Sequence, residues 1–104
     1  MLLGMDHVAI ICSNYERSKH FYVNVLGLTV IAETFREARS SYKLDLALPD
    51  NTQIELFSFP DAPKRLSYPE AQGLRHLAFK VASVDEAISH LQSHGVVCEP
   101  VRVD

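Results

Sequence analysis

An internal repeat constrains the fold of this chain more strongly than any other feature of its sequence. Three features of the first half recur in the second half, at offsets of 69, 70 and 68 residues. The matched features are a histidine that opens an apolar segment (His7 and His76), a Ser-x-x-Glu sequence (Ser13 and Ser83) and a glycine after an amphipathic stretch (Gly27 and Gly95). Agreement within one residue across three kinds of feature indicates two copies of one structural unit.

The first copy has the pattern of a βαβββ module. Its Ser-x-x-Glu sequence is a capping box, which begins a helix, and its glycine is the residue type that most often ends one. The apolar segments before and after this helix have the pattern of strands. The predicted elements are a strand at 6–12, a helix from Ser13 to Leu26, and strands at 28–36, 41–48 and 52–59.

The second copy follows a proline-rich segment at 60–72, which we interpret as a surface linker. Its predicted elements are a strand at 74–81, a helix from Ser83 that ends at Gly95, and a strand at 96–103. The chain is therefore predicted to be one α+β domain of residues 1–104, built from paired βαβββ modules. The first module spans 1–59, and the second, at 73–104, lacks its last strands, which would leave an open sheet edge. We expect either that another chain covers this edge or that further residues complete the sheet.

Charge and hydropathy exclude two classes of partner. The net charge of −3 offers no basic surface for nucleic acid or for an anionic membrane. The longest apolar run, Val8–Cys12, is too short to cross a bilayer. The first six residues lack the basic region of a secretory leader, so we expect a cytoplasmic protein whose two cysteines remain reduced thiols.

Strand geometry places both repeated histidines on the same side of a sheet. Side chains alternate between two faces along a strand, and the fully apolar face of each strand must receive a helix. In the first strand the apolar face carries alternate residues of Val8–Cys12, so His7 is expected on the other, concave side. The same alternation places His76 there, and also Glu55 if its two apolar neighbours face a helix.

Two imidazoles and a carboxylate gathered on one face suit a divalent metal such as Zn²⁺, Ni²⁺, Mn²⁺ or Fe²⁺. We therefore predict a metal site formed by His7, Glu55 and His76. If the repeat also applies to Glu55, its equivalent falls 69 positions later, beyond Asp104. The complete site would then be a quasi-symmetric His-Glu-His-Glu set, of which this sequence supplies three members.

Simpler interpretations stand beside this one. A single histidine on a strand is more often a structural or surface residue than a ligand, and Glu55 also fits an outward position on a half-exposed strand. The matched places of the histidines in the repeat favour the metal site, and an unpaired carboxylate beside Phe57 and Phe59 would be costly. His90 and His94 have the spacing of one helix face but lack a third ligand, so we expect surface residues.

Basic residues offer candidates for binding a substrate carboxylate or phosphate, and the sequence does not choose among them. The candidates are Arg36, Arg39, Lys43, Lys64, Arg65 and Arg75. Alternating apolar residues from Tyr42 to Leu48 predict a core stripe, which leaves Lys43 and Asp45 on the opposite side of their strand.

Four segments together resemble the vicinal-oxygen-chelate superfamily, which has the glyoxalase/bleomycin-resistance/dioxygenase fold. They are His7 at the start of its strand, the helix end HFYVNVLGL, the strand Ile54-Glu55-Leu56, and Gly73-Leu74-Arg75-His76-Leu77-Ala78-Phe79. Within it the chain is most similar to the glyoxalase I (lactoylglutathione lyase) group. The resemblance covers nearly the whole chain and implies that His7, Glu55 and His76 are metal ligands. The family's fourth ligand, a second glutamate, has no counterpart in residues 1–104.

This resemblance implies a metal-dependent lyase or isomerase. Zinc or nickel would hold two adjacent oxygens of a hemithioacetal, formed from a 2-oxoaldehyde and glutathione or another thiol, and would stabilise an enediolate. A carboxylate beside the metal, for which Glu55 is the candidate, would remove the proton α to the carbonyl and return it to the neighbouring carbon. Relatives form the site between two subunits, so a homodimer is also implied.

Other functions of the same fold remain open. The superfamily resemblance also admits a thiol transferase, an epimerase or a ring-cleaving dioxygenase, although a first-module carboxylate such as Glu55 favours glyoxalase-like chemistry. A metal-free protein that sequesters a small molecule in its concave groove is an alternative from a different class. The presence or absence of a stoichiometric metal separates the enzymes from the binding protein.

Overall fold

The computed structural model describes residues 1–103, and the chain divides into two compact units, Met1–Arg65 and Leu66–Asp104. Residue 104, the last of the predicted second module, lies outside the described residues. The division between the units falls within the predicted linker at 60–72. The boundaries of the two sequence modules remain predictions.

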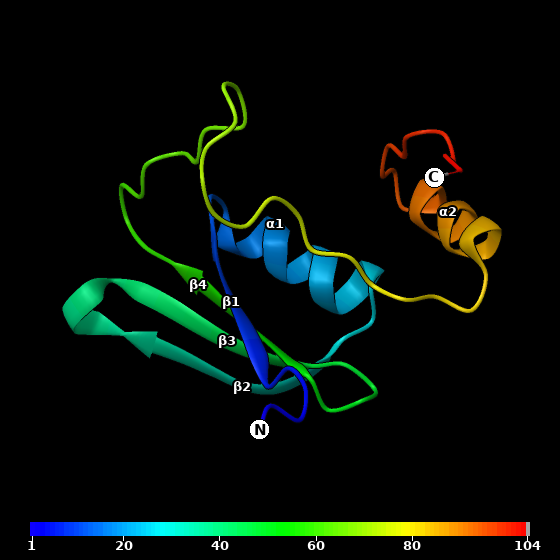
Figure 1. Ribbon diagram of the computed structural model, residues 1–104. Coiled ribbons are helices and arrows are strands. Elements are labelled where there is room, and N and C mark those ends of the chain that lie inside the picture. Colours follow the sequence, from blue (N-terminus) through cyan, green and yellow to red (C-terminus); the bar gives the residue numbers. More distant parts are fainter. Residues whose placement is uncertain (104) are drawn as a thin grey trace. The chain divides into compact units, whose positions relative to one another are not determined.

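The first unit contains a βαβββ module (Figure 1). Its elements are β1 (His7–Cys12), α1 (Tyr15–Lys19), the π-helical η1 (His20–Val25), β2 (Thr29–Arg36), the 3₁₀ turn η2 (Glu37–Arg39), β3 (Ser41–Ala47) and β4 (Gln53–Ser58). The strands form one mixed sheet in the order β1-β4-β3-β2, in which β1 runs parallel to β4 and the other neighbours are antiparallel. The α+β class is confirmed, and every strand of this module begins and ends within one residue of its predicted bounds.

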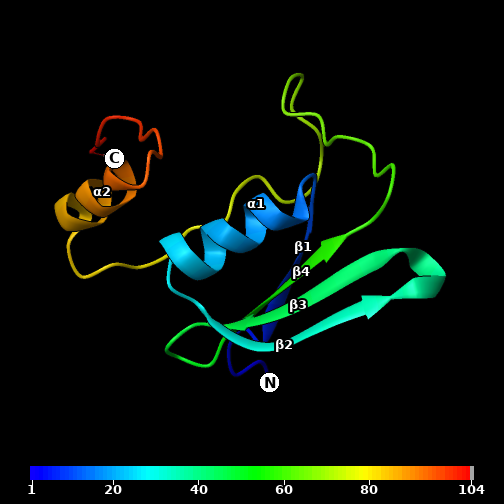
Figure 2. The same cartoon turned by 180° about the vertical axis from the view of Figure 1, so that it is seen from behind.

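The core of the first unit lies between α1 and one face of the sheet (Figures 1 and 2). Tyr15 of α1 stacks on Tyr42 of β3 with ring centroids 4.3 Å apart, which identifies the helix side of that strand. Four apolar side chains of β3 and β4 are at most 2% exposed: Leu44, Leu46, Ile54 and Leu56. The predicted core stripe is therefore confirmed, and so is the inward orientation of the two neighbours of Glu55.

The start of the first helix differs from the prediction by one residue. Asn14, not Ser13, is the N-cap, and its side-chain oxygen accepts a hydrogen bond from the N–H three residues later at 3.1 Å. Asparagine caps helices as well as serine does, so either residue fits the local pattern. In the second unit Ser83 caps its helix as predicted. The observed caps are 69 residues apart, which is the offset of the repeated histidines.

The two repeated glycines have the same backbone conformation. Gly27 and Gly95 each have a φ angle of +77°, in the left-handed region that glycine adopts without steric cost. Gly27 follows η1, and Gly95 follows α2 (Val84–Ser93). The prediction that each glycine ends a helix is confirmed.

Hydrogen bonds on the helix side tie β2 to α1. The Glu33 carboxylate accepts a hydrogen bond from the Tyr15 hydroxyl and another from the Lys19 ammonium at 2.8 Å. The bond from Lys19, and then the bond from Tyr15, lowers the pKa of Glu33 because both stabilise its ionised form. Burial, and then the bond to Glu33, raises the pKa of Tyr15, so its hydroxyl remains a donor at neutral pH.

Replacing Glu33 with glutamine is expected to lower the free energy of unfolding of the first unit by about 0.5–1 kcal/mol at neutral pH, a modest effect because the ion pair is partly solvated. The lowered pKa means that the folded state keeps Glu33 ionised to a lower pH than the unfolded chain does. Its stabilising effect is therefore present above pH 4.5 and is lost as the pH falls below that value. Urea unfolding of the variant and of the wild type, at neutral pH and at about pH 3, measures the difference in their free energies of unfolding. A difference between variant and wild type that does not shrink on acidification would rule out the ionised carboxylate as its cause.

The second unit contains the second predicted helix but not the predicted strands. Helix α2 (Val84–Ser93) forms, whereas the strands predicted at 74–81 and 96–103 are wrong for this structure, since neither segment joins a β-ladder. A strand needs a neighbour that takes its backbone N–H and C=O groups, and residues 66–103 contain no strand that could serve as one. No helix within residues 1–103 is long and apolar enough to span a membrane.

Candidate metal centre

The face of the sheet opposite α1 carries the predicted ligands of the first unit, and we call it the open face. Along β1 the exposure alternates, with His7 exposed and its neighbour Val8 partly covered. Along β4, Glu55 alternates with fully buried core residues, so it is directed away from the helix. The strand registers bring side chains of three strands to this face, and it is defined by His7, Lys43, Asp45, Glu55 and Phe57.

His7 and Glu55 lie at the spacing of two ligands of one metal ion. The distance from His7 Nε2 to Glu55 Oε2 is 3.6 Å, and their side chains are 45% and 20% exposed. Two donor atoms that each bind a metal at about 2.1 Å lie about 3.4 Å apart at the tetrahedral angle. The observed spacing is close to that value. An imidazole nitrogen and a carboxylate oxygen are also donors that Zn²⁺ and Ni²⁺ accept, so these two residues fit the predicted metal.

Asp6 orients the imidazole of His7. Its Oδ2 atom lies 2.6 Å from His7 Nδ1, and because an ionised carboxylate can only accept, Nδ1 carries the proton of this hydrogen bond. In the neutral ring the lone pair is then on Nε2, the nitrogen that faces Glu55. The hydrogen bond to Asp6, and then the charge of Glu55, raises the pKa of His7. A carboxylate on the far nitrogen is a common partner of metal-binding histidines.

Replacing Asp6 with asparagine is expected to weaken binding of Zn²⁺ by about tenfold, because the ring is then held less firmly and its nitrogen is less basic. Competition with a chromophoric chelator at neutral pH measures the affinity. Asp61→Asn removes the same charge from an exposed residue and serves as the matched control. Equal affinities for the Asp6 variant and for the control would show that Asp6 does not support the ligand.

The turn between β3 and β4 decides which residues meet on the open face. The predicted turn at Pro49–Asn51 is present, and the Asp50 carboxylate accepts hydrogen bonds from the N–H and the hydroxyl of Thr52 at 3.0 and 2.6 Å. These bonds lower the pKa of Asp50 because they stabilise its ionised form. The register that follows from it places Asp45 directly opposite Glu55.

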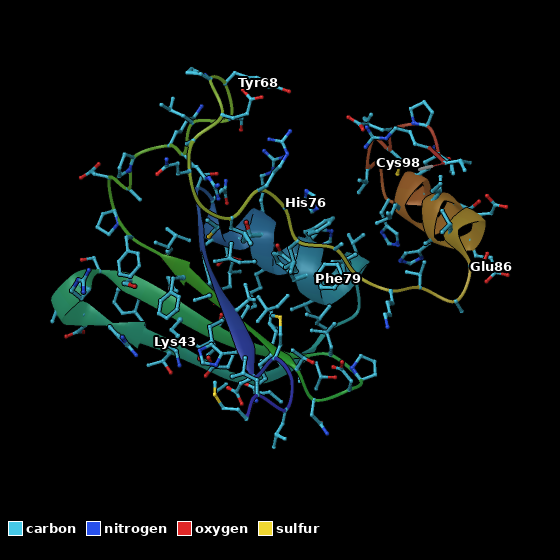
Figure 3. All side chains as sticks on the ribbon, viewed as in Figure 1. Lys43, Tyr68, His76, Phe79, Glu86 and Cys98 are labelled. Carbon is cyan, nitrogen blue, oxygen red and sulfur yellow. The ribbon has the colours of Figure 1, made fainter. Side chains whose placement is uncertain are left out.

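A lysine lies between these two opposed carboxylates. Lys43 Nζ is 3.1 Å from Asp45 Oδ1 and 3.9 Å from Glu55 Oε2, and its position on β3 can be seen in Figure 3. Its hydrogen bond goes to Asp45 Oδ2 at 3.4 Å. Oδ1 is buried and accepts no hydrogen bond from any residue in the described range 1–103. The positive charge that this buried oxygen meets is the Lys43 ammonium, 3.1 Å away.

Aromatic rings continue the open face beyond Glu55. The rings of Phe57 and Phe59 stack with centroids 5.8 Å apart, and the Arg39 guanidinium lies 4.8 Å from the centroid of the Phe59 ring. A guanidinium above an aromatic ring is attracted to its π-electrons. These side chains form an apolar surface with a cationic group at one end, which suits contact with the organic part of an anionic small molecule.

His76, the third predicted ligand, belongs to the second unit and lies in the segment before α2 (Figure 3). The structure thus brings His7 and Glu55 together within the first unit. Across residues 1–103 no three His, Cys, Asp or Glu side chains form a group that could hold a metal ion. The three-ligand set therefore stays a prediction, supported by its His7–Glu55 pair. The ring centroids of His90, in α2, and His94, the residue after it, lie 4.7 Å apart.

Two acidic residues of this site, Asp6 and Asp45, are not among the predicted ligands. Asp6 was counted within the first strand, but β1 begins at His7, so the alternation of side chains does not apply to it. The adjacent pair Asp6-His7 was the available signal. Asp45 was placed on the correct side of its strand, but only the register across the turn reveals that it faces Glu55.

Comparison with known proteins identifies the family. Residues 4–104 match the model of the Glyoxalase/Bleomycin resistance protein/Dioxygenase superfamily. The chain belongs to this superfamily. It is the group that the sequence motifs resemble, the vicinal-oxygen-chelate proteins, so the predicted family and fold are confirmed.

The chain is also similar to individual proteins, two of which have solved structures. The uncharacterized protein YwkD of Bacillus subtilis is 58% identical over 104 residues, which cover 100% of this chain and 81% of YwkD. The crystal structure of a glyoxalase family protein from Enterococcus faecalis is 47% identical with a TM-score of 0.91, and the match covers 98% of this chain and 80% of that one. The trypanothione-dependent glyoxalase I of Leishmania major is 25% identical with a TM-score of 0.75, over 96% of this chain and 72% of that one. Both solved structures share the fold of this vicinal-oxygen-chelate protein.

Proposed function

We propose that this vicinal-oxygen-chelate protein is a divalent-metal-dependent lyase of the glyoxalase I type. Its substrate would be a hemithioacetal, the adduct of a small 2-oxoaldehyde with glutathione or another thiol. The observation that carries the proposal is the His7–Glu55 pair, whose donor atoms lie 3.6 Å apart on the open face with Asp6 behind the imidazole. The likeness to the glyoxalase I of Leishmania major supports the same class of reaction.

His7, Glu55 and His76 are proposed as the residues that hold the metal. Zinc or nickel suits a set of two imidazoles and one carboxylate. When bound, the metal supplies a Lewis acid that stabilises negative charge developing on the substrate oxygens. Asp6 supports this site by keeping the Nε2 lone pair of His7 directed toward Glu55.

Glu55 is proposed as the group that moves the proton. Its carboxylate would accept the proton from the carbon that carries the sulfur and return it to the adjacent carbonyl carbon. The hydroxyl proton of the adduct passes to the former carbonyl oxygen, so the product is an isomer of the substrate and no atom or electron is gained or lost. The stacked rings of Phe57 and Phe59 would contact the organic part of the adduct and exclude water from it.

We also propose that the protein acts as a homodimer in the cytoplasm. A second copy would cover the open face, and the cytoplasm is the compartment in which thiols such as glutathione stay reduced. Light scattering on the purified protein measures its mass. A mass twice the 11.7 kDa of this chain supports the dimer, and a mass of one chain rejects it.

Metal analysis combined with a turnover assay tests the proposed reaction. The expected result is one divalent ion per site and conversion of a methylglyoxal–thiol adduct by the nickel or zinc form. Iron together with oxygen uptake would indicate a dioxygenase instead. If the purified protein carries no stoichiometric divalent metal, and if His7→Ala does not lower its metal content, the result would indicate a metal-free binding protein.

A further inference from the structure

Two carboxylates of the open face occupy directly opposed positions. Asp45 of β3 pairs with Glu55 of β4 in the antiparallel register, and their side chains are 19% and 20% exposed. Like charges in opposed cross-strand positions repel each other and destabilise the sheet. Partial burial strengthens the repulsion because less water lies between the charges. The pair therefore requires a positive charge nearby.

Lys43 supplies that charge from the strand that carries Asp45. Its Nζ is 3.1 Å from Asp45 Oδ1 and 3.9 Å from Glu55 Oε2, and its side chain is 23% exposed. The distance to Glu55 is beyond hydrogen-bond range. Lys43 is therefore anchored by Asp45 and acts on Glu55 through charge alone.

We propose that Lys43, anchored by Asp45, limits the affinity of the His7–Glu55 site for divalent ions and sets its preference among them. This inference rests on the metal site proposed above. An ion with two positive charges bound at Glu55 is repelled by the nearby ammonium. Without the ammonium, Asp45 becomes a second unpaired carboxylate opposite Glu55, and added carboxylate favours ions that prefer oxygen, such as Mn²⁺, over Zn²⁺.

Calorimetric titration of metal-stripped protein with Mn²⁺ and with Zn²⁺ tests the inference. Lys43→Met is expected to bind Mn²⁺ at least about tenfold more tightly than the wild type, with a smaller gain for Zn²⁺. Lys43→Arg keeps the charge and should bind both ions as the wild type does. Lys19→Met is the matched control, because Lys19 forms a 2.8 Å ion pair with Glu33 on the helix side of the sheet, and it should leave both affinities unchanged.

The sign of the effect separates this role from a structural one. A lysine that merely holds the strands together would, when lost, weaken the binding of both ions. Affinity for Mn²⁺ equal to or below the wild-type value in a folded Lys43→Met protein, as judged by circular dichroism, overturns the inference. The double variant Lys43→Met/Asp45→Asn removes both charges and should return to near the wild-type affinity. A gain that persists in the double variant overturns the part assigned to Asp45.

Failure of the proposed metal site would give a different pattern. If the wild type binds neither ion but Lys43→Met binds Mn²⁺, the inference holds while the proposed metal-dependent function fails. If the wild type binds Zn²⁺ but neither protein binds Mn²⁺, the inference fails while the proposed metal site stands. If neither protein binds either ion, both fail.

Discussion

Replacing His7 with alanine is expected to weaken the binding of Zn²⁺ or Ni²⁺ by at least about a hundredfold, because the loss of a ligand should cost more than the loss of the residue that orients it. His7 is the imidazole whose Nε2 lies 3.6 Å from Glu55 and whose other nitrogen is held by Asp6. The other histidine of the first unit, His20, lies in η1. Calorimetric titration of the metal-stripped protein measures the change.

His20→Ala is the matched control for this experiment. His20 is an exposed histidine at the start of η1, and its loss removes an imidazole from the same unit without touching the open face. The control should bind metal as the wild type does. Equal losses in the two variants, or an intact affinity in His7→Ala, would remove His7 from the metal site.

Replacing Leu44 with alanine is expected to lower the free energy of unfolding of the first unit by about 2–5 kcal/mol. Leu44 is fully buried between the sheet and α1, and truncation removes its apolar contacts and leaves a cavity in a core of only a few large side chains. Chemical denaturation followed by circular dichroism measures the change.

Leu3→Ala provides the reference for that measurement. Leu3 is fully exposed, and the same truncation there should change the stability by no more than about 0.5 kcal/mol. If Leu44→Ala were no more costly than Leu3→Ala, the core would not lie where the alternation of β3 places it.

The fold of the first unit could be predicted because its local signals and its packing agree. Alternation along β3 and β4 separates Leu44 and Leu56 from Lys43 and Glu55, and the structure buries the first pair and leaves the second on the open face. The first residue of the helix could not be predicted in the same way, because consecutive serine and asparagine residues are equally good caps and only the backbone conformation selects Asn14.

The second unit shows the limit of local pattern. Segments 74–81 and 96–103 have the composition of strands, but a strand exists only when a neighbour takes its hydrogen bonds, and such pairing is not a local property. The helix of the same unit was predicted because its hydrogen bonds are internal and its cap, Ser83, is encoded beside it.

The candidate site, like the fold, could be predicted only in part. The shared face of His7 and Glu55 follows from strand alternation, and the structure places them in contact range. The charges that surround Glu55 depend on the register between β3 and β4, which the turn sets, so the positions of Lys43 and Asp45 relative to Glu55 could not be read from spacing alone.

X-ray absorption spectroscopy of the zinc- or nickel-loaded protein tests the central claim most directly, because scattering from imidazole rings counts the histidines bound to the metal. We expect two imidazoles in the wild-type spectrum and one each in His7→Ala and His76→Ala, with His20→Ala unchanged. A wild-type spectrum without imidazole scattering, or one that keeps both imidazoles when His76 is replaced, would contradict a metal site built from His7, Glu55 and His76.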